Sequence, residues 1–170
     1  TTLFRSVLVE IEEGVKTFQG PNPDEVALVQ AAYELGIEFV ERIGKNIKIK
    51  VQGVEQHYEI LQKFEFTSAR ARSSIIVKNI STDEIKLYLK GADTMILKSL
   101  DMFSTINILP NTKEHLEKFA KLGLRTLCYS FKILDREEYY KWEELFKEEK
   151  YLSLINKDVD MEKIIKLIET

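Results

Sequence analysis

The sequence contains one cysteine, Cys128, which excludes an intramolecular disulfide. A chain of 170 residues can bury a sizeable hydrophobic core, so it needs neither a disulfide nor a structural metal to fold. No apolar run approaches the ~18 residues of a transmembrane helix, and the charged start, TTLFRSVLVEIEEG, is unlike a signal peptide. The single cysteine leads us to expect a reducing compartment. An initiating methionine is also lacking, so we expect a segment of a longer protein.

The signals of several functional classes are missing too. The formal net charge of −3 is too small and too mixed to indicate a nucleic-acid or anionic-membrane partner. The two histidines, His57 and His115, stand outside any metal-ligand spacing. A Gly-x-Ser-x-Gly motif, a P-loop and a dinucleotide-binding glycine loop are absent. We therefore assign no metal ligand and no catalytic residue, and we expect one globular domain over residues 1–170.

The first half of the chain is dominated by strand-like alternation. Residues 3–11 are short and apolar, and we favour a helix there over a strand. Glycine and two prolines predict a loop at 17–23, and a helix is expected over 23–36, with acidic residues in its first turn. Period-two alternation predicts strands at 37–43, 46–51, 57–66, 72–79 and 84–90.

The second half is mostly helical by pattern. Helices are predicted at 91–100, 111–123, 135–150 and 160–169. A loop is expected at 103–110, and residues 124–134 should form a strand that returns to the sheet. Short connections between the earlier strands favour antiparallel pairing, because parallel pairing needs long crossovers. The predicted fold class is α+β, an antiparallel sheet of about six strands flanked by helices.

Three short segments carry side chains that a sheet alone does not require. They are Phe66 with Ser68, Arg70 and Arg72, then Lys90 before a glycine, and Arg125 after a helix stop. An aromatic ring and guanidinium groups can stack on a flat ligand and meet its phosphates. Taken singly, each segment has a plainer explanation: Phe66 as a core residue, the arginines as solvated, the glycine as a turn.

Four motifs occur in a fixed order: PNPDEVALVQAA, FEFTSARARSSIIV, LYLKGADTMIL and HLEKFAKLGLRTLCYS. Together they closely resemble the nucleotide-binding (N) domain of P-type ATPases, and within that family the lipid-flippase, or phospholipid-transporting, branch. The similarity runs from about residue 3 to residue 150. It implies an N-domain fold and an ATP-binding function.

The resemblance also implies roles for individual residues. Phe66 would stack on the adenine, and Glu25 would line the adenine end of the pocket. Lys90 would lie at the base of the pocket, near the adenine and the α-phosphate. Arg125 would reach the ribose and the β-phosphate. A stacked purine gains about 1–3 kcal/mol, so we expect a weak site with a Kd near the millimolar range, about −4 kcal/mol.

Ser68 and Arg72 would flank the adenine ring from the loop after Phe66. Two neighbouring positions depart from the family pattern. Ala71 stands where a lysine is usual, which removes a positive charge near the phosphates. Ser73 stands where a methionine is usual, which removes an apolar wall of the pocket.

The resemblance extends to partners and cofactors. In the family, the N domain is a cytoplasmic part of a multi-pass membrane pump and passes the γ-phosphate of ATP to an aspartate in a separate P domain. Mg²⁺ is held by the nucleotide and the P domain. The expected partners are ATP, the P and A domains of the parent chain, and in some pumps an accessory subunit. The phosphorylated Asp-Lys-Thr-Gly-Thr motif is missing from this sequence, so this segment alone could not turn over ATP by the pump mechanism.

Ala71 and Ser73 leave a second hypothesis open. The chain could be a degenerate N domain with weak or no ATP binding, acting as a regulatory or structural module. Such a module could be fused to another enzyme, for example a guanylate cyclase.

Overall fold

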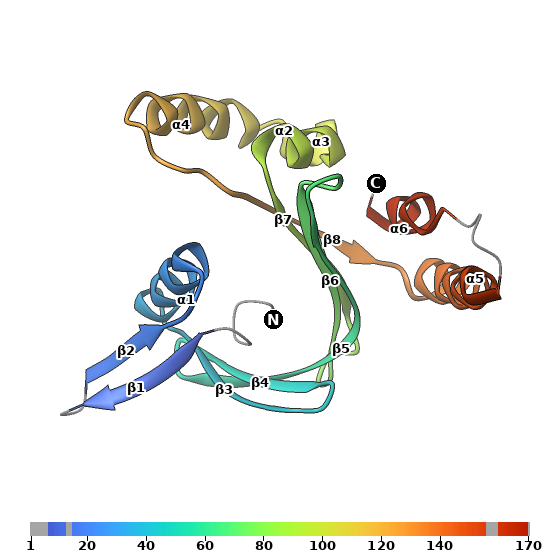
Figure 1. Cartoon of the computed structure of the whole chain (residues 1–170), viewed down its shortest axis with the longest axis horizontal. Helices are drawn as coiled ribbons and strands as arrows, with labels where there is room; N and C mark the ends of the chain where they lie inside the picture. The colour runs from blue at the N-terminus through green and yellow to red at the C-terminus, as the bar shows by residue number, and fades with distance from the viewer. Residues whose placement is uncertain (1–6, 13–14, 156–159, 170) are drawn as a thin grey trace. The chain divides into compact units, whose positions relative to one another are not determined.

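The computed structural model describes residues 7–12, 15–155 and 160–169 (Figure 1). Hydrogen bonding places six strands in one sheet in the order β3-β4-β5-β6-β7-β8, and β1 and β2 form a separate pair. The predicted α+β class, with a six-stranded antiparallel sheet flanked by helices, is confirmed. The contacts divide the chain into two compact units, residues 1–62 with 77–84 and residues 63–76 with 85–170. That residues 1–170 form a single domain stays a prediction.

The first unit begins with an antiparallel pair, β1 (Leu8–Glu12) and β2 (Val15–Gln19). The helix favoured for 3–11 is wrong over its described residues from Leu8 onward, and the loop expected at 17–23 begins only after Gln19. In each segment the local pattern is too short to decide. Pairing between the two segments decides it: five residues of β1 lie opposite five of β2, with Val9 opposite Phe18.

Helix α1 (Pro23–Glu34) confirms the prediction for this segment. The side chain of Asn22 caps it by accepting a hydrogen bond from the backbone N–H of Asp24 at 3.0 Å. Proline at the first helical position and two acidic residues in the first turn favour this start. The ring of Tyr33 then packs on Phe18 of β2, with ring centroids 5.5 Å apart.

The strands predicted at 37–43 and 46–51 are confirmed with their bounds unchanged, as the antiparallel hairpin of β3 (Ile37–Ile43) and β4 (Asn46–Val51). Gly44 adopts a positive φ of 60° in the turn, which a residue without a Cβ accepts at no steric cost. The next strand, β5 (Val54–Thr67), pairs with β4 and is longer than predicted at both ends.

The second unit holds the last residues of β5, most of β6 and the helical half of the chain. Its further elements are β6 (Arg72–Asn79), β7 (Ile85–Gly91), α2 (Asp93–Ile96), η1 (Leu97–Ser99), α3 (Met102–Thr105), α4 (Leu109–Lys121), β8 (Cys128–Leu134), α5 (Arg136–Ile155) and α6 (Met161–Glu169). Figure 1 shows α5 and α6 side by side.

Two expectations for this unit need correction. The loop expected at 103–110 contains α3 and the start of α4. The carboxylate of Asp101 begins α3 by accepting from the backbone N–H of Ser104 at 2.9 Å, and this bond lowers the pKa of Asp101. The strand expected at 124–134 starts only at Cys128, because residues 124–127 belong to the connection that follows α4.

An aromatic cluster joins β5 to α5 in the core of the second unit. Phe64 makes edge contacts with Trp142 at 6.1 Å and with Phe146 at 5.5 Å between ring centroids. Trp142 and Phe146 stack on each other at 5.1 Å. The indole N–H of Trp142 donates to the carbonyl of Ile164 at 2.9 Å, so the same cluster also attaches α6.

Gly91 permits a close backbone contact at the end of β7. A Cβ at this position would lie 2.6 Å from the carbonyl oxygen of Ala71 and 2.7 Å from the Cβ of Arg72. The neighbouring N–H of Ala92 donates to the same Ala71 carbonyl at 3.2 Å. The turn between β5 and β6 therefore rests directly on the end of β7.

The aromatic cluster gives the first prediction. Phe64→Ala should lower the free energy of unfolding by about 3–5 kcal/mol, the usual cost of removing a buried phenyl ring. The measurement is urea unfolding followed by tryptophan fluorescence. Phe103→Ala is the control, since Phe103 is 88% exposed and its removal should change stability by under about 0.5 kcal/mol. Equal effects would contradict the packing described here.

A second prediction concerns Gly91. Gly91→Ala should destabilise the chain by about 2 kcal/mol or more, because the new methyl group overlaps backbone that cannot move independently. The same unfolding experiment applies. Gly123→Ala is the matched control: Gly123 has a φ of 71° but no neighbour near an added Cβ, so only the backbone strain of about 1–2 kcal/mol should appear. A Gly91→Ala variant less affected than the control would argue against the contact.

Candidate functional site

Phe66 is the second-last residue of β5, next to the turn that follows the strand, and is 61% exposed. Its neighbour along the strand, Phe64, is 7% exposed and belongs to the core. The suggestion that Phe66 is a core residue is therefore wrong. An exposed aromatic ring beside a tight turn is available to stack on a planar ligand.

The turn that follows Phe66 is internally bonded. The N–H of Ala71 donates to the carbonyl of Thr67 at 2.8 Å, and the N–H of Arg70 donates to the Thr67 hydroxyl at 3.2 Å. Ala71 has a φ of 49°, which is uncommon for a residue with a Cβ. Ser68 lies exposed within this turn. Ser68 therefore lies in the predicted loop, which is a hydrogen-bonded turn, and it is exposed at the surface.

The structure brings the Lys90 segment to the same turn. Lys90 is half-buried and directly precedes Gly91, whose backbone lies against Ala71 and Arg72. In the β7–β8 ladder, Lys90 pairs with Tyr129 and Gly91 pairs with Cys128. Three of the motifs found in the sequence therefore meet where β5 ends, β6 begins, β7 ends and β8 begins.

Arg125 lies in the connection between α4 and β8, three residues before Cys128. Its side chain is exposed. Helix α4 ends when Gly123 takes a positive φ and the N–H of Leu124 donates to the carbonyl of Phe119 at 3.0 Å. Arg125 is among the residues that line an open cavity of about 1130 Å³ between β7, β8 and α4.

Glu25 is the one predicted site residue in the first unit. It is a buried residue of α1, and α1 belongs to the first unit, whereas the other predicted site residues belong to the second. The proximity of Glu25 to them stays a prediction.

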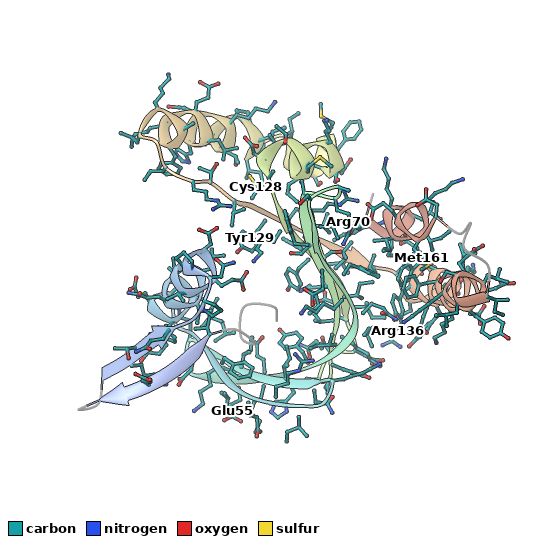
Figure 2. The ribbon with its side chains drawn as sticks, viewed as in Figure 1. Glu55, Arg70, Cys128, Tyr129, Arg136 and Met161 are labelled. Carbon is teal, nitrogen blue, oxygen red and sulfur yellow. The ribbon has the colours of Figure 1, made fainter. Side chains whose placement is uncertain are left out.

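Arg70 and Arg72 have a partner that the sequence did not reveal. Both are buried, at 6% and 7% exposure, so the explanation that they are solvated is wrong. Their guanidinium groups contact the carboxylates of Glu162 and Glu169 on α6. Figure 2 shows the labelled Arg70 between the turn and α6. The predicted contact of Arg72 with a nucleotide stays a prediction.

The single cysteine, Cys128, is the first residue of β8 and pairs with Gly91. Burial, followed by the charge of Asp93, raises the pKa of the thiol. The group is therefore protonated at neutral pH and is a poor nucleophile. Among the described residues, no cluster of three or more His, Cys, Asp or Glu side chains could hold a metal ion. The described helices also include none with the length and apolar character to cross a membrane.

Comparison with known proteins gives a family. The sequence model of the family described as "P-type ATPase, cytoplasmic domain N" matches residues 3–164. Phospholipid-transporting ATPase IC of Xenopus tropicalis is 35% identical over 168 residues, which is 99% of this chain and 13% of that protein. Phospholipid-transporting ATPase ID of Homo sapiens is 41% identical over 135 residues, 79% of this chain and 11% of that protein.

Phospholipid-transporting ATPase tat-1 of Caenorhabditis elegans is 38% identical over 138 residues, 81% of this chain and 12% of that protein. The chain thus spans between 11% and 13% of the length of these relatives. The resemblance stated from the sequence motifs is confirmed. The chain belongs to the cytoplasmic N domains of the P-type ATPases, in the branch of the phospholipid-transporting ATPases.

Proposed function

We propose that this chain is the ATP-binding domain of a phospholipid-transporting pump and presents ATP to an aspartate in a separate P domain. The observation that supports this most strongly is the exposed ring of Phe66 beside a turn that rests on Gly91, next to Lys90. A π-face and a cationic segment are thereby held on one rigid scaffold. A purine nucleotide has a matching flat, uncharged half and an anionic half.

The proposed roles follow from this arrangement. Phe66 stacks on the adenine, and Ser68 borders the ring from the turn. Lys90 lies at the base of the site, near the adenine and the α-phosphate, while Arg125 reaches the ribose and the β-phosphate. Glu25 lines the adenine end of the pocket. Both cationic contacts are partly exposed, so each adds little binding energy and the site releases nucleotide readily.

Arg72 is the predicted site residue for which the structure gives another partner. Its Nε donates to Glu169 at 2.7 Å and its Nη2 donates to Glu162 at 2.9 Å. These bonds use the donors that would otherwise meet a phosphate. We therefore propose that Arg72 borders the nucleotide through the backbone of its turn.

The remaining parts of the reaction belong to the parent protein. The proposed parent is a multi-pass membrane pump in which Mg²⁺ is held by the nucleotide and the P domain, and the P and A domains act on this one. An accessory subunit is a further proposed partner of the parent. The relatives named above are phospholipid-transporting ATPases and give no support to the alternative of a degenerate module fused to a cyclase.

The central test is the removal of the Phe66 ring. ATP is titrated into the isotopically labelled chain, and backbone amide shifts are followed by NMR up to about 10 mM, which would largely fill a millimolar site. Saturable shifts should cluster at Phe66, Lys90 and Arg125. Phe66→Ala should weaken binding by about 10-fold, since stacking contributes about 1–3 kcal/mol per base. Phe103→Ala, which removes an exposed ring elsewhere, should bind as the wild type does. No saturable shift in the wild type would refute the proposal.

Restoring the charge at position 71 gives a further prediction. Ala71→Lys should tighten ATP binding about 3-fold to 10-fold, because a lysine on this half-buried turn adds one contact to the phosphates. Ala71→Gln is the control of similar length without the charge. The gain should shrink when salt rises from 0.05 to about 0.5 M, since screening weakens partly exposed charge pairs. Equal affinities for the two variants would show that the phosphates lie away from the turn.

A further inference from the structure

Helix α6 presents two carboxylates on one face. Glu162 and Glu169 are seven residues apart, which is two helical turns or about 10.5 Å along the axis. Both side chains therefore point to the same side of the helix. Glu169 has a side chain only 1% exposed, whereas that of Glu162 is 42% exposed. A buried carboxylate near the end of a surface helix requires a strong partner.

That partner is the pair of arginines that encloses Ala71. Glu169 accepts hydrogen bonds from Nη2 of Arg70 at 2.5 Å and from Nε of Arg72 at 2.7 Å, and it also accepts one from the hydroxyl of Ser74. Glu162 lies 2.8 Å from Nε of Arg70 and 2.9 Å from Nη2 of Arg72. Each carboxylate thus bridges both guanidinium groups, and the four charges cancel.

The arginines also hold the backbone on which Phe66 is mounted. Nη1 of Arg70 donates to the carbonyl of Glu65 at 3.0 Å, directly before Phe66, and Nη1 of Arg72 donates to the carbonyl of Arg70 at 3.3 Å. The guanidinium of Arg70 lies 5.7 Å from the ring centre of Phe64. The direction of these two guanidinium groups therefore fixes both ends of the turn.

We infer that Glu162 and Glu169 are positioning residues for nucleotide binding, acting through Arg70 and Arg72 on the turn that carries Phe66. The inference rests on the ATP site proposed above and deepens it. Without the carboxylates, two buried like charges would face each other and turn toward water. The turn would lose the bond that orients Phe66 and its contact with β7, and the adenine platform would become mobile.

The test uses the 170-residue chain and four proteins: wild type, Glu162→Gln, Glu169→Gln and Ile168→Val. Glu162→Gln is the main variant, because its half-exposed side chain makes folding robust. Ile168→Val is the matched control, since Ile168 is 1% exposed on the same helix and its change loosens α6 packing without touching a charge. Each protein is titrated with ATP and, separately, with adenosine, and amide hydrogen exchange is recorded.

A positioning role predicts that Glu162→Gln lowers the affinities for ATP and for adenosine by the same factor. That factor should be about 3-fold to 10-fold, as expected for coupled neighbours. Glu169→Gln should lower both affinities further. The amides of Ala71 and Ala92 should exchange faster in both charge variants, while Ile168→Val keeps wild-type affinity and exchange. If Ile168→Val lowers the two affinities as much as Glu162→Gln does, the cluster acts only through the stability of α6 and the inference is overturned.

Two other outcomes also overturn it. If Glu162→Gln binds ATP more tightly than the wild type does, the carboxylates compete with the phosphates for the arginines. If Glu162→Gln lowers the affinity for ATP but not for adenosine, the arginines contact the phosphates themselves. Failure of the inference is distinguishable from failure of the proposed function. If wild type binds ATP and Glu162→Gln binds it equally, only the positioning role is lost; if wild type binds neither ligand, both are lost.

Discussion

The second unit depends on one buried carboxylate, that of Glu169. It receives hydrogen bonds from two arginines and a serine that lie 95 to 99 positions earlier in the chain. Burying a lone carboxylate is costly, and this one is tolerated because guanidinium groups neutralise it and satisfy its oxygens. The same set of bonds joins α6 to the β5–β6 turn. A helix near the end of the described chain thereby becomes part of the support for the proposed site.

The support continues from the turn into the sheet. Gly91 has no side chain, so the end of β7 can lie against Ala71 and Arg72. This contact places Lys90, the preceding residue, next to the turn. Pairing of Gly91 with Cys128 then fixes the start of β8, just after Arg125. Phe66, Lys90 and Arg125 are thus proposed to meet the nucleotide from positions fixed by the backbone, and their own side chains remain partly or largely exposed. This division suits the proposed function, in which ATP binds weakly and is released readily.

The sequence predicted the parts of the fold with strong periodicity and failed where a distant partner decides. The bounds of β6 and of the β3–β4 hairpin were predicted correctly, because alternation and turn glycines act locally. The strand β1 was missed because five residues show no clear period without β2 beside them. For the site, the motifs made Phe66, Lys90 and Arg125 candidates, and their contact with a nucleotide stays a prediction. An arginine's sequence neighbourhood does not show whether it meets phosphate or carboxylate, and the structure pairs Arg70 and Arg72 with carboxylates. The spacing of Glu162 and Glu169 on α6 was the only local signal of their contacts with these arginines.

The most direct measurement of the central claim is a set of intermolecular NOEs between ATP and the Phe66 ring in the ATP-saturated chain. Stacking predicts NOEs from adenine H2 and H8 to the ring protons of Phe66, and none to the buried ring of Phe64. If the adenine protons instead show NOEs to other residues, with Phe66 silent, the ring is not the nucleotide platform and the account of the site is wrong.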